Sequence, residues 1–386
     1  MAPSLRVLPS TVGGRGLFAP DGAHFTPGQT IATYKPLVYS VTPGMAKACC
    51  HWCLTTEASK YYQCSGCRYA VYCSRECARA AYKLGTHKKE CQLIQKLPAD
   101  HASSAPLSTF LAAAKLHWLA QGNDEVRENL SNMCRHPDES DTVEADSGST
   151  AILLSRYLDD APPVHVMLDL LRVLRYNAVT VTNDSLQDVA LSLFEEVAAT
   201  NHSCAPNVVL TFSGSTVTLR AIRTVPEGGE LFISYIDICT APTAKRRQRL
   251  RDQYKFDCTC PSKVDEESSY PNLVYAEEDL RLSVQKQDWK EAARAGRLVD
   301  ELRSSLSGGQ EYDICRGVNA YMLAKILSLE DDSLREALTY FSKAYRILSV
   351  TNGSDHPMVE EIKGKMIELR NYVQYKTPVP QILNDN

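Results

Sequence analysis

The chain has 386 residues, with 42 Lys and Arg against 46 Asp and Glu. Its hydrophobic content of 44% is enough to fill buried cores, which excludes a small disulfide-stapled protein and a disordered one. The formal charge of −4 gives no global basic field that would draw the molecule to nucleic acid. The N-terminal segment lacks the apolar stretch of a secretory signal, and no later stretch is apolar over a membrane span. We therefore expect a soluble chain of the nucleus or cytoplasm, without a membrane partner.

Short apolar runs separated by turn residues predict strands near the N-terminus. Residues 30–34 and 37–41 are two such runs, each flanked by a Pro-Gly pair. They follow a glycine-rich segment at residues 13–19, which lacks the spacing of a dinucleotide-binding loop. Taken alone, that segment is more often a simple turn.

Eight of the 14 cysteines lie between Cys49 and Cys91. In an intracellular protein they indicate metal binding or catalysis, because reducing compartments keep thiols free. A spacer of two or three residues turns two ligands onto one ion, and two such pairs complete a closed, structural zinc shell. Four consecutive pairs therefore predict two zinc ions, without Cys49. The eight ligands are Cys50, Cys53, Cys64, Cys67, Cys73, Cys77, His87 and Cys91.

The motifs CHWC, CSGC, YCSREC and HKKEC resemble, in order and spacing, those of a MYND zinc finger. The resemblance implies interleaved ligand sets, with Cys50, Cys53, Cys73 and Cys77 on one zinc and Cys64, Cys67, His87 and Cys91 on the other. It also implies a peptide partner or, for a basic finger, DNA. Six cations keep the nucleic-acid hypothesis open, although such charges are more often the solvated side of a zinc module. They are Arg68, Arg75, Arg79, Lys83, Lys88 and Lys89.

Helical periodicity follows the cysteine-rich segment. Residues 107–120 and 151–175 carry apolar residues at helical spacing, which predicts a helical insert. Between them, residues 137–150 are acidic, free of aromatic residues and almost without core-forming side chains. We predict a loop there.

The segment from Asn201 to Asp237 predicts a β-rich domain. Alternating apolar residues on both sides of Ser213-Gly214-Ser215 predict a hairpin, and residues 231–237 predict a further strand. The pair Asn201-His202 precedes the hairpin. From the residues alone, such a pair is more often a turn than a site, and a tyrosine in a strand is usually a core residue.

The ordered motifs GRGLFA, NHSCAPN, GGELFISYID and FDCTC resemble those of the SET domain of protein-lysine methyltransferases. With the finger inserted after the first strands, the chain resembles the SET and MYND domain (SMYD) family over residues 5 to 375. The resemblance implies an α+β multidomain fold, a β-rich SET domain split by the finger and a helical insert and followed by an all-α TPR-like domain. The implied domains are the first SET part (1–46), the finger (47–92), the insert (93–175), the SET core (176–256), the post-SET segment (257–270) and the C-terminal helices (271–386).

The resemblance implies S-adenosylmethionine as cofactor and a lysine of a histone or another protein as substrate. It assigns the catalytic role to Tyr235, and it makes Asn201 and His202 hold the amino and adenine edges of the cofactor. A lysine with a pKa of about 10.4 is protonated in water, and a cationic sulfonium and an aromatic channel both favour its neutral form. The other implied cofactor residues are Gly14, Arg15, Gly16, Asn132, Asn177, Tyr235, Tyr254 and Phe256, and the implied channel comprises Val179, Tyr235, Tyr254 and Phe256.

A third zinc closes the SET domain in this family, and here its ligand set is incomplete. Three of its cysteines match Cys204, Cys258 and Cys260, but the fourth position is Lys263. Water, Asp265 or another side chain would have to complete the shell, or no zinc is bound there.

Two further departures concern the channel and a turn. Val179 replaces a frequent Phe, which widens the channel and alters the degree of methylation. Gly229 replaces a frequent acid, but Glu230 is retained and we expect little effect on the site. The departures keep open an alternative function, a catalytically weak or inactive adaptor that recruits protein partners through the finger and the helical array.

Beyond residue 270 the apolar spacing predicts helices. Their pairing is typical of a TPR-like array, although no consensus repeat is present. We expect a monomer. The basic run at residues 245–251 is consistent with nuclear import or nucleic-acid contact, but a solvated helix face is the more usual interpretation. The predicted helices span 280–287, 289–306, 312–327, 333–348 and 357–375, and the predicted buried thiols are Cys134, Cys239 and Cys315.

Overall fold

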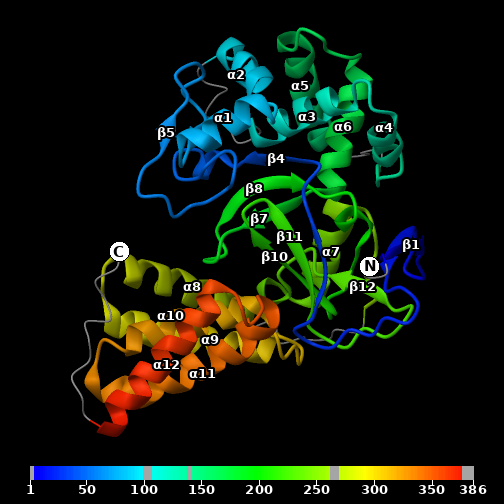
Figure 1. The fold of residues 1–386 in the computed structure, drawn as a ribbon. Helices are drawn as coiled ribbons and strands as arrows, with labels where there is room; N and C mark the ends of the chain where they lie inside the picture. Colours follow the sequence, from blue (N-terminus) through cyan, green and yellow to red (C-terminus); the bar gives the residue numbers. More distant parts are fainter. Residues whose placement is uncertain (1–3, 99–106, 137–140, 261–268, 376–386) are drawn as a thin grey trace. The chain divides into compact units, whose positions relative to one another are not determined.

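The computed structural model describes residues 4–98, 107–136, 141–260 and 269–375 (Figure 1). The chain divides into two compact units. Unit 1 comprises Met1–Ala32, Asn201–Thr211 and Leu219–Asn386, and unit 2 comprises Thr33–Thr200 and Phe212–Thr218. Both contain strands and helices, which confirms the predicted α+β class. Within the described ranges, no helix is long and apolar enough to cross a membrane. The bounds of the six domains remain predictions.

Unit 2 contains an antiparallel sheet and a group of helices that share one core. The sheet has the order β4-β8-β7. Its core includes side chains from three helices and one strand, among them Leu116, Leu154, Met167 and Leu193, all essentially inaccessible to solvent. The elements are β4 (Val38–Val41), η1 (Pro43–Met45), α3 (Leu107–Ala120), α4 (Asp124–Ser131), α5 (Asp141–Tyr157), α6 (Val164–Asn177), β7 (Val179–Thr182), β8 (Asp188–Leu193) and η2 (Val197–Ala199).

The predicted loop over residues 137–150 is wrong from residue 141 onward. Helix α5 begins at Asp141 and continues through the acidic stretch. Ala151 and Leu154, further along α5, are fully buried. Burial of these residues anchors the helix, and its acidic first turns extend from that anchored part, because tertiary packing outweighs a polar composition. Residues 137–140 lie outside the described residues.

The cysteine-rich part of unit 2 is a small module with little regular structure. The hairpin β5–β6 (Tyr62–Gln63 and Val71–Tyr72) leads into α1 (Arg75–Lys83) and α2 (His87–Lys96). Ser74 caps α1, since its side chain accepts a hydrogen bond from the backbone N–H of Cys77. One cluster of buried residues between these elements comprises Cys50, Ala70, Tyr72 and Ala81, and predicted ligand cysteines pack against it.

Unit 1 contains the sheet that positions the candidate site. Its order is β1-β2-β12-β9, with β12 antiparallel to β2 and parallel to β9. The predicted hairpin around Gly214 is confirmed as β10 and β11, which form a sheet of order β10-β11-β3. The elements are β1 (Arg6–Pro9), β2 (Arg15–Phe18), β3 (Thr30–Tyr34), β9 (Asn201–His202), β10 (Val208–Ser213), β11 (Thr216–Ala221) and β12 (Glu230–Ile233), of which β3, β10 and β11 include residues assigned to unit 2.

The strand predicted over residues 231–237 is shorter than expected, because β12 ends at Ile233. The backbone N–H of Tyr235 donates to Nδ1 of His202 at 3.0 Å instead of to a neighbouring strand. Asp237 then caps the short helix η3 (Ile238–Thr240) by accepting from the N–H of Cys239. Tyr235 therefore lies in an irregular segment just beyond the sheet.

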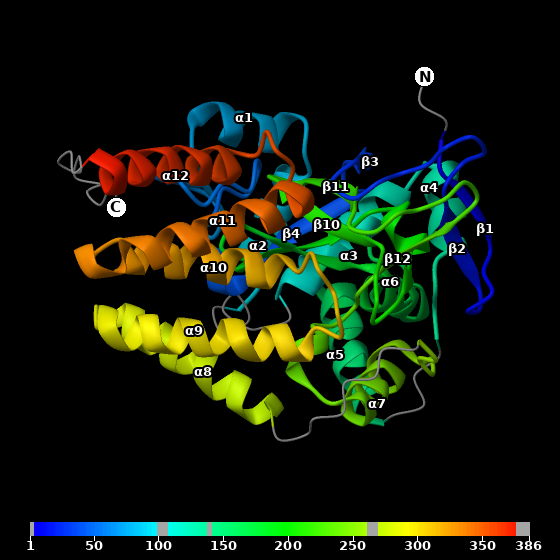
Figure 2. The same cartoon turned by 90° about the horizontal axis from the view of Figure 1, so that it is seen from below.

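Helices make up the rest of unit 1. Figure 2 shows α8 to α12 stacked in chain order, each in contact with the next. The predicted bounds of α9 and α12 agree with the structure, whereas α8 starts well before the predicted residue 280. The helices are α7 (Thr243–Tyr254), α8 (Ser269–Gln285), α9 (Trp289–Leu306), α10 (Ile314–Leu327), the short η4 (Asp331–Ser333), α11 (Leu334–Thr351) and α12 (Pro357–Tyr375).

Two expectations about single side chains are wrong. Arg246, in the basic run on α7, is only 1% exposed, whereas Lys245, Arg247 and Arg249 face solvent as predicted. Cys134 is exposed, with its Sγ 3.0 Å from Nε2 of His136. The spacing of residues in the sequence predicts neither the burial of Arg246 nor the exposure of Cys134.

Candidate functional site

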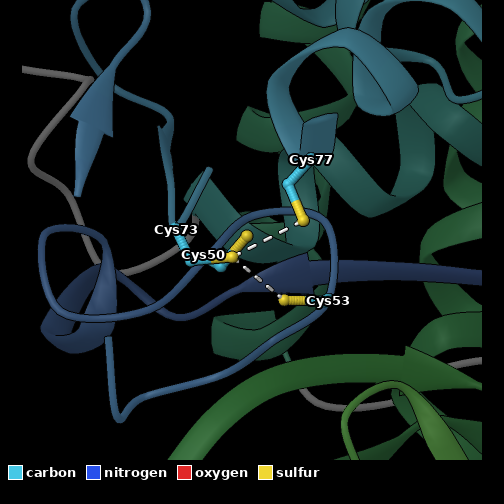
Figure 3. Close-up of side chains that lie close together, drawn as sticks. All are labelled: Cys50, Cys53, Cys73 and Cys77. Carbon is cyan, nitrogen blue, oxygen red and sulfur yellow. Dashed lines mark hydrogen bonds between the residues drawn. The ribbon is translucent and has the colours of Figure 1, made fainter. Parts of the chain in front are cut away.

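The first group of predicted metal ligands comprises Cys50, Cys53, Cys73 and Cys77, whose sulfurs lie within 4.8 Å of one another. Figure 3 shows the four side chains pointing toward a common centre. The Cys53–Cys73 and Cys73–Cys77 Sγ distances are 3.6 Å and 3.5 Å. A tetrahedral ion with Zn–S bonds of about 2.3 Å needs an edge of about 3.8 Å. The donor set therefore fits a zinc ion.

The second group comprises Cys64, Cys67, His87 and Cys91. Sγ of Cys64 lies 3.8 Å from Sγ of Cys91 and 3.3 Å from Nε2 of His87. A Cβ added to Gly66 would lie 2.8 Å from the Cys91 sulfur, which is too close for a normal contact. Glycine at this position therefore leaves room for the sulfur. The structure thus brings together the same two interleaved sets that the family resemblance implies.

A buried ion pair supports the second group. Nδ1 of His87 faces a carboxylate oxygen of Glu90 at 3.9 Å, and the other Glu90 oxygen lies 2.6 Å from Nζ of Lys115. Both side chains of the Glu90–Lys115 pair are 12% exposed. Lys115 also donates to the backbone oxygen of Tyr39 at 2.6 Å. A ligating histidine commonly has such a carboxylate behind it, which orients the ring.

The third group comprises His202, Cys204, Cys258 and Cys260. Nε2 of His202 lies 3.4 Å from Sγ of Cys204. However, Nδ1 of His202 accepts the N–H of Tyr235, and burial lowers the pKa of His202 to about 4. The neutral ring therefore carries its proton on Nε2, whereas a ligating histidine needs a lone pair there. His202 fits a hydrogen-bond donor to the Cys204 sulfur, not a metal ligand.

Three cysteines thus remain as donors for a third zinc among the described residues. Their geometry fits less well than that of the finger, since the Cys258 and Cys260 sulfurs are only 2.8 Å apart. Lys263 and Asp265, the residues at and near the usual fourth-ligand position, lie outside the described residues.

The predicted cofactor residues Arg15, Gly16 and Asn201 lie together across β2, β12 and β9. The Asn201 amide nitrogen donates to the backbone oxygen of Arg15 at 2.9 Å and to Oε1 of Glu230 at 2.8 Å. The second Glu230 oxygen accepts from the Ser10 hydroxyl at 2.9 Å. These contacts fix the orientation of the amide and present its carbonyl oxygen as a hydrogen-bond acceptor.

Glu230 contacts the predicted cofactor residues but was not among the site residues predicted from the sequence. It holds Asn201 and lies against Gly16, where an added Cβ would be 2.2 Å from Oε1. Gly14 has a positive φ of 64° at the turn before β2. The sequence signal was present in the GRG and GGEL motifs, but only the pairing of β2 with β12 brings them together.

An aromatic cluster surrounds Tyr235. Its ring centroid lies 4.8 Å from Tyr254, 5.3 Å from His202 and 6.2 Å from Phe256. Burial raises the pKa of Tyr254, so its hydroxyl stays neutral near physiological pH. The structure therefore brings together three of the four predicted channel residues in unit 1.

The remaining predicted residues belong to unit 2. Asn177 is 6% exposed, and its side chain bonds to the backbone of Cys134 and to the Val173 oxygen at 2.8 to 3.1 Å. Its amide thus joins the end of α6 to the segment after α4. Asn132 is exposed at the C-terminus of α4, and Val179 begins β7.

Comparisons with known proteins agree with this architecture. The family model for the SET domain matches residues 14–236. Histone-lysine N-methyltransferase SMYD3 of Mus musculus is 25% identical over 92% of this chain and 86% of its own length. N-lysine methyltransferase SMYD2-A of Danio rerio is 25% identical over 92% of this chain and 96% of its own length. N-lysine methyltransferase SMYD2 of Mus musculus is 30% identical over 64% of this chain and 57% of its own length.

The match covers more than half of the chain, which therefore belongs to the SET domain family. Within that family, its relatives are the SET and MYND domain proteins, and its enzyme class is that of the protein-lysine N-methyltransferases.

Proposed function

We propose that the protein transfers a methyl group from S-adenosylmethionine to a lysine side chain of a protein substrate, either a histone or a non-histone protein. Two observations support this proposal: Glu230 fixes the Asn201 amide through a hydrogen bond, and aromatic rings cluster around Tyr235. When bound, the cofactor supplies a methyl group on a cationic sulfur.

Cofactor binding needs acceptors for a positively charged amino group. The Asn201 carbonyl oxygen and the neighbouring Glu230 carboxylate provide them, and a charged donor makes such hydrogen bonds strong. Gly16 leaves the Glu230 carboxylate in place. The chemistry of these residues therefore fits the amino end of S-adenosylmethionine.

The aromatic cluster serves the lysine. Tyr235, Tyr254 and Phe256 surround the side chain with apolar rings, which penalise the ammonium form and favour the neutral amine. The Tyr235 hydroxyl orients the amine. Placing two reactants in line contributes about 7 to 11 kcal/mol to lowering a barrier, so no strong acid or base is required.

A calorimetric titration with S-adenosylmethionine tests this function without knowledge of the substrate. Wild-type protein should bind one equivalent, and Asn201→Ala should lose binding, whereas Ser203→Ala, two residues along the chain, should retain it. Transfer of labelled methyl groups to histones and to a protein extract should then depend on Tyr235, with Tyr235→Phe as the inactive control. Folded, zinc-loaded protein without cofactor binding would favour the adaptor function instead.

We also propose two structural zinc ions in the finger, held by the two sets of four ligands described above. Their sulfur spacings and the place left by Gly66 support this part of the proposal. Metal analysis by mass spectrometry should give two zinc ions per chain, or three if the Cys204 group binds one. Fewer than two would contradict the assignment.

A further inference from the structure

The segment that follows Tyr235 is held by its own polar groups. The Ser234 hydroxyl donates to the Ile236 oxygen at 2.7 Å. One oxygen of the Asp237 carboxylate accepts the N–H of Cys239 at 2.8 Å and so caps η3. The other oxygen faces the C-terminal helices. Asp237 is therefore the residue through which other parts of unit 1 can hold this segment in place.

Arg303 of α9 makes that contact. Its guanidinium donates to Oδ2 of Asp237 at 2.9 Å, and its Nε donates to Glu277 of α8 at 2.8 Å. Arg303 is 6% exposed, whereas the two carboxylates are about one-third exposed. The planar guanidinium with its fixed donors suits a rigid link of this kind better than a lysine would.

The environment of Arg303 makes this link costly to break. The partly buried Asp313 also interacts with Arg303, since desolvation raises the pKa of its carboxyl and Arg303 opposes that rise. Buried charges without partners carry a large desolvation penalty. Ile238 and Cys239 of η3 share one apolar core with Leu273 and Ala276 of α8. The helices and the segment are therefore packed together around Arg303.

Arg246 forms a second link to the same segment. It is almost fully buried and donates to the backbone oxygens of Ile238 and Ala241 and to the hydroxyl of Tyr270 in α8. Both ends of η3 are thus bound by arginines, one from α7 and one from α9. Of the two, Arg303 alone reaches the carboxylate that caps η3 two residues after Tyr235.

We propose that Arg303 is a positioning residue for methyl transfer, which through Asp237 fixes the segment that carries Tyr235. This inference rests on the proposed function, in which the Tyr235 hydroxyl orients the lysine amine. It gives the C-terminal helices a role in catalysis beyond shaping a substrate surface. A displacement of the reacting groups by about 1 Å can cost roughly 100-fold in rate, so a loosened segment should slow the reaction.

The test compares Arg303→Met with Arg297→Met. Arg297 lies on the same helix and forms an equally direct pair with Glu336 of α11, without contact to Asp237. For each variant we would measure the affinity for S-adenosylmethionine, kcat and KM, and the ¹⁹F spectrum of protein labelled with fluorotyrosine. The Tyr235 signal among the 19 tyrosines is assigned by its loss in Tyr235→Phe.

We expect Arg303→Met to lower kcat by roughly 10- to 100-fold and to shift or broaden the Tyr235 signal, with cofactor affinity unchanged within about twofold. Arg297→Met should alter none of these. Equal kcat values and equal Tyr235 signals in the two variants would overturn the inference. If Arg303→Met fails to fold, Asp237→Asn replaces it, because the amide keeps the acceptor for η3 and loses only the charge that pairs with Arg303.

The two proposals fail in different ways. Wild-type protein that neither binds S-adenosylmethionine nor transfers methyl groups would refute the proposed function, and with it the catalytic role of Arg303. Active wild-type protein with an unaltered Arg303→Met variant would refute the positioning role alone.

Discussion

Replacing Gly16 by alanine should weaken S-adenosylmethionine binding without unfolding the protein. The added Cβ would lie 2.2 Å from Oε1 and 2.8 Å from Cδ of Glu230, so the carboxylate must move. It cannot move freely, because Ser10 and Asn201 both donate to it. The displacement would break the hydrogen bond that fixes the Asn201 amide.

The expected magnitude follows from that one bond. A hydrogen bond to a charged group contributes about 1.5 to 3 kcal/mol, which corresponds to roughly a 10- to 100-fold change in Kd. Gly16 lies in β2 outside the left-handed region of φ, so alanine is compatible with the backbone. The melting temperature should therefore change little.

Calorimetric titration of four proteins tests this reasoning. Gly44→Ala is the matched control, since its added Cβ has open space and its φ is ordinary. Glu230→Ala removes the group that the new methyl would displace, so Gly16→Ala should add almost nothing in that background. Affinity retained in Gly16→Ala, or fully additive losses in the double variant, would refute the argument.

Two further predictions concern the finger. Gly66→Ala should press on the Cys91 sulfur and speed zinc release to a chelator by at least about tenfold relative to Gly44→Ala, measured with a zinc dye. Glu90→Leu should leave Lys115 as an unpaired buried cation and lower the free energy of unfolding by about 3 to 5 kcal/mol in urea. Adding Lys115→Leu should restore most of that loss, and a double variant as unstable as the single one would contradict it.

Local patterns carried much of the fold prediction. The apolar periods of α3, α9 and α12 and the short run of β3 gave the right bounds, because each depends on neighbours within a few residues. The two four-ligand groups of the finger were predictable for a related reason. Each pair is a local turn, and only the interleaving of pairs required the family resemblance.

Burial that depends on distant residues was not predictable. The acidic start of α5 is helical because Ala151 and Leu154 anchor the helix further along. Arg246 belongs to a basic run in the sequence, yet carbonyl oxygens of η3 and the Tyr270 hydroxyl surround its guanidinium. Composition describes the residues of a segment, whereas partners from elsewhere in the chain decide which side chain is buried.

Contacts with distant residues also explain why the sequence did not predict the surroundings of Tyr235. The apolar run at residues 231–237 predicted a strand through Tyr235, but a strand would commit the Tyr235 N–H to the ladder. In the structure that N–H goes to His202, and the His202 ring is thereby kept from binding metal through Nε2. Glu230 at the start of β12 then holds the Asn201 amide, and Asp237 beyond the end of β12 pairs with Arg303 of α9. One short strand thus connects the proposed cofactor residue Asn201, the proposed catalytic Tyr235 and the helical array, which makes Arg303 and Glu230 the informative positions to mutate.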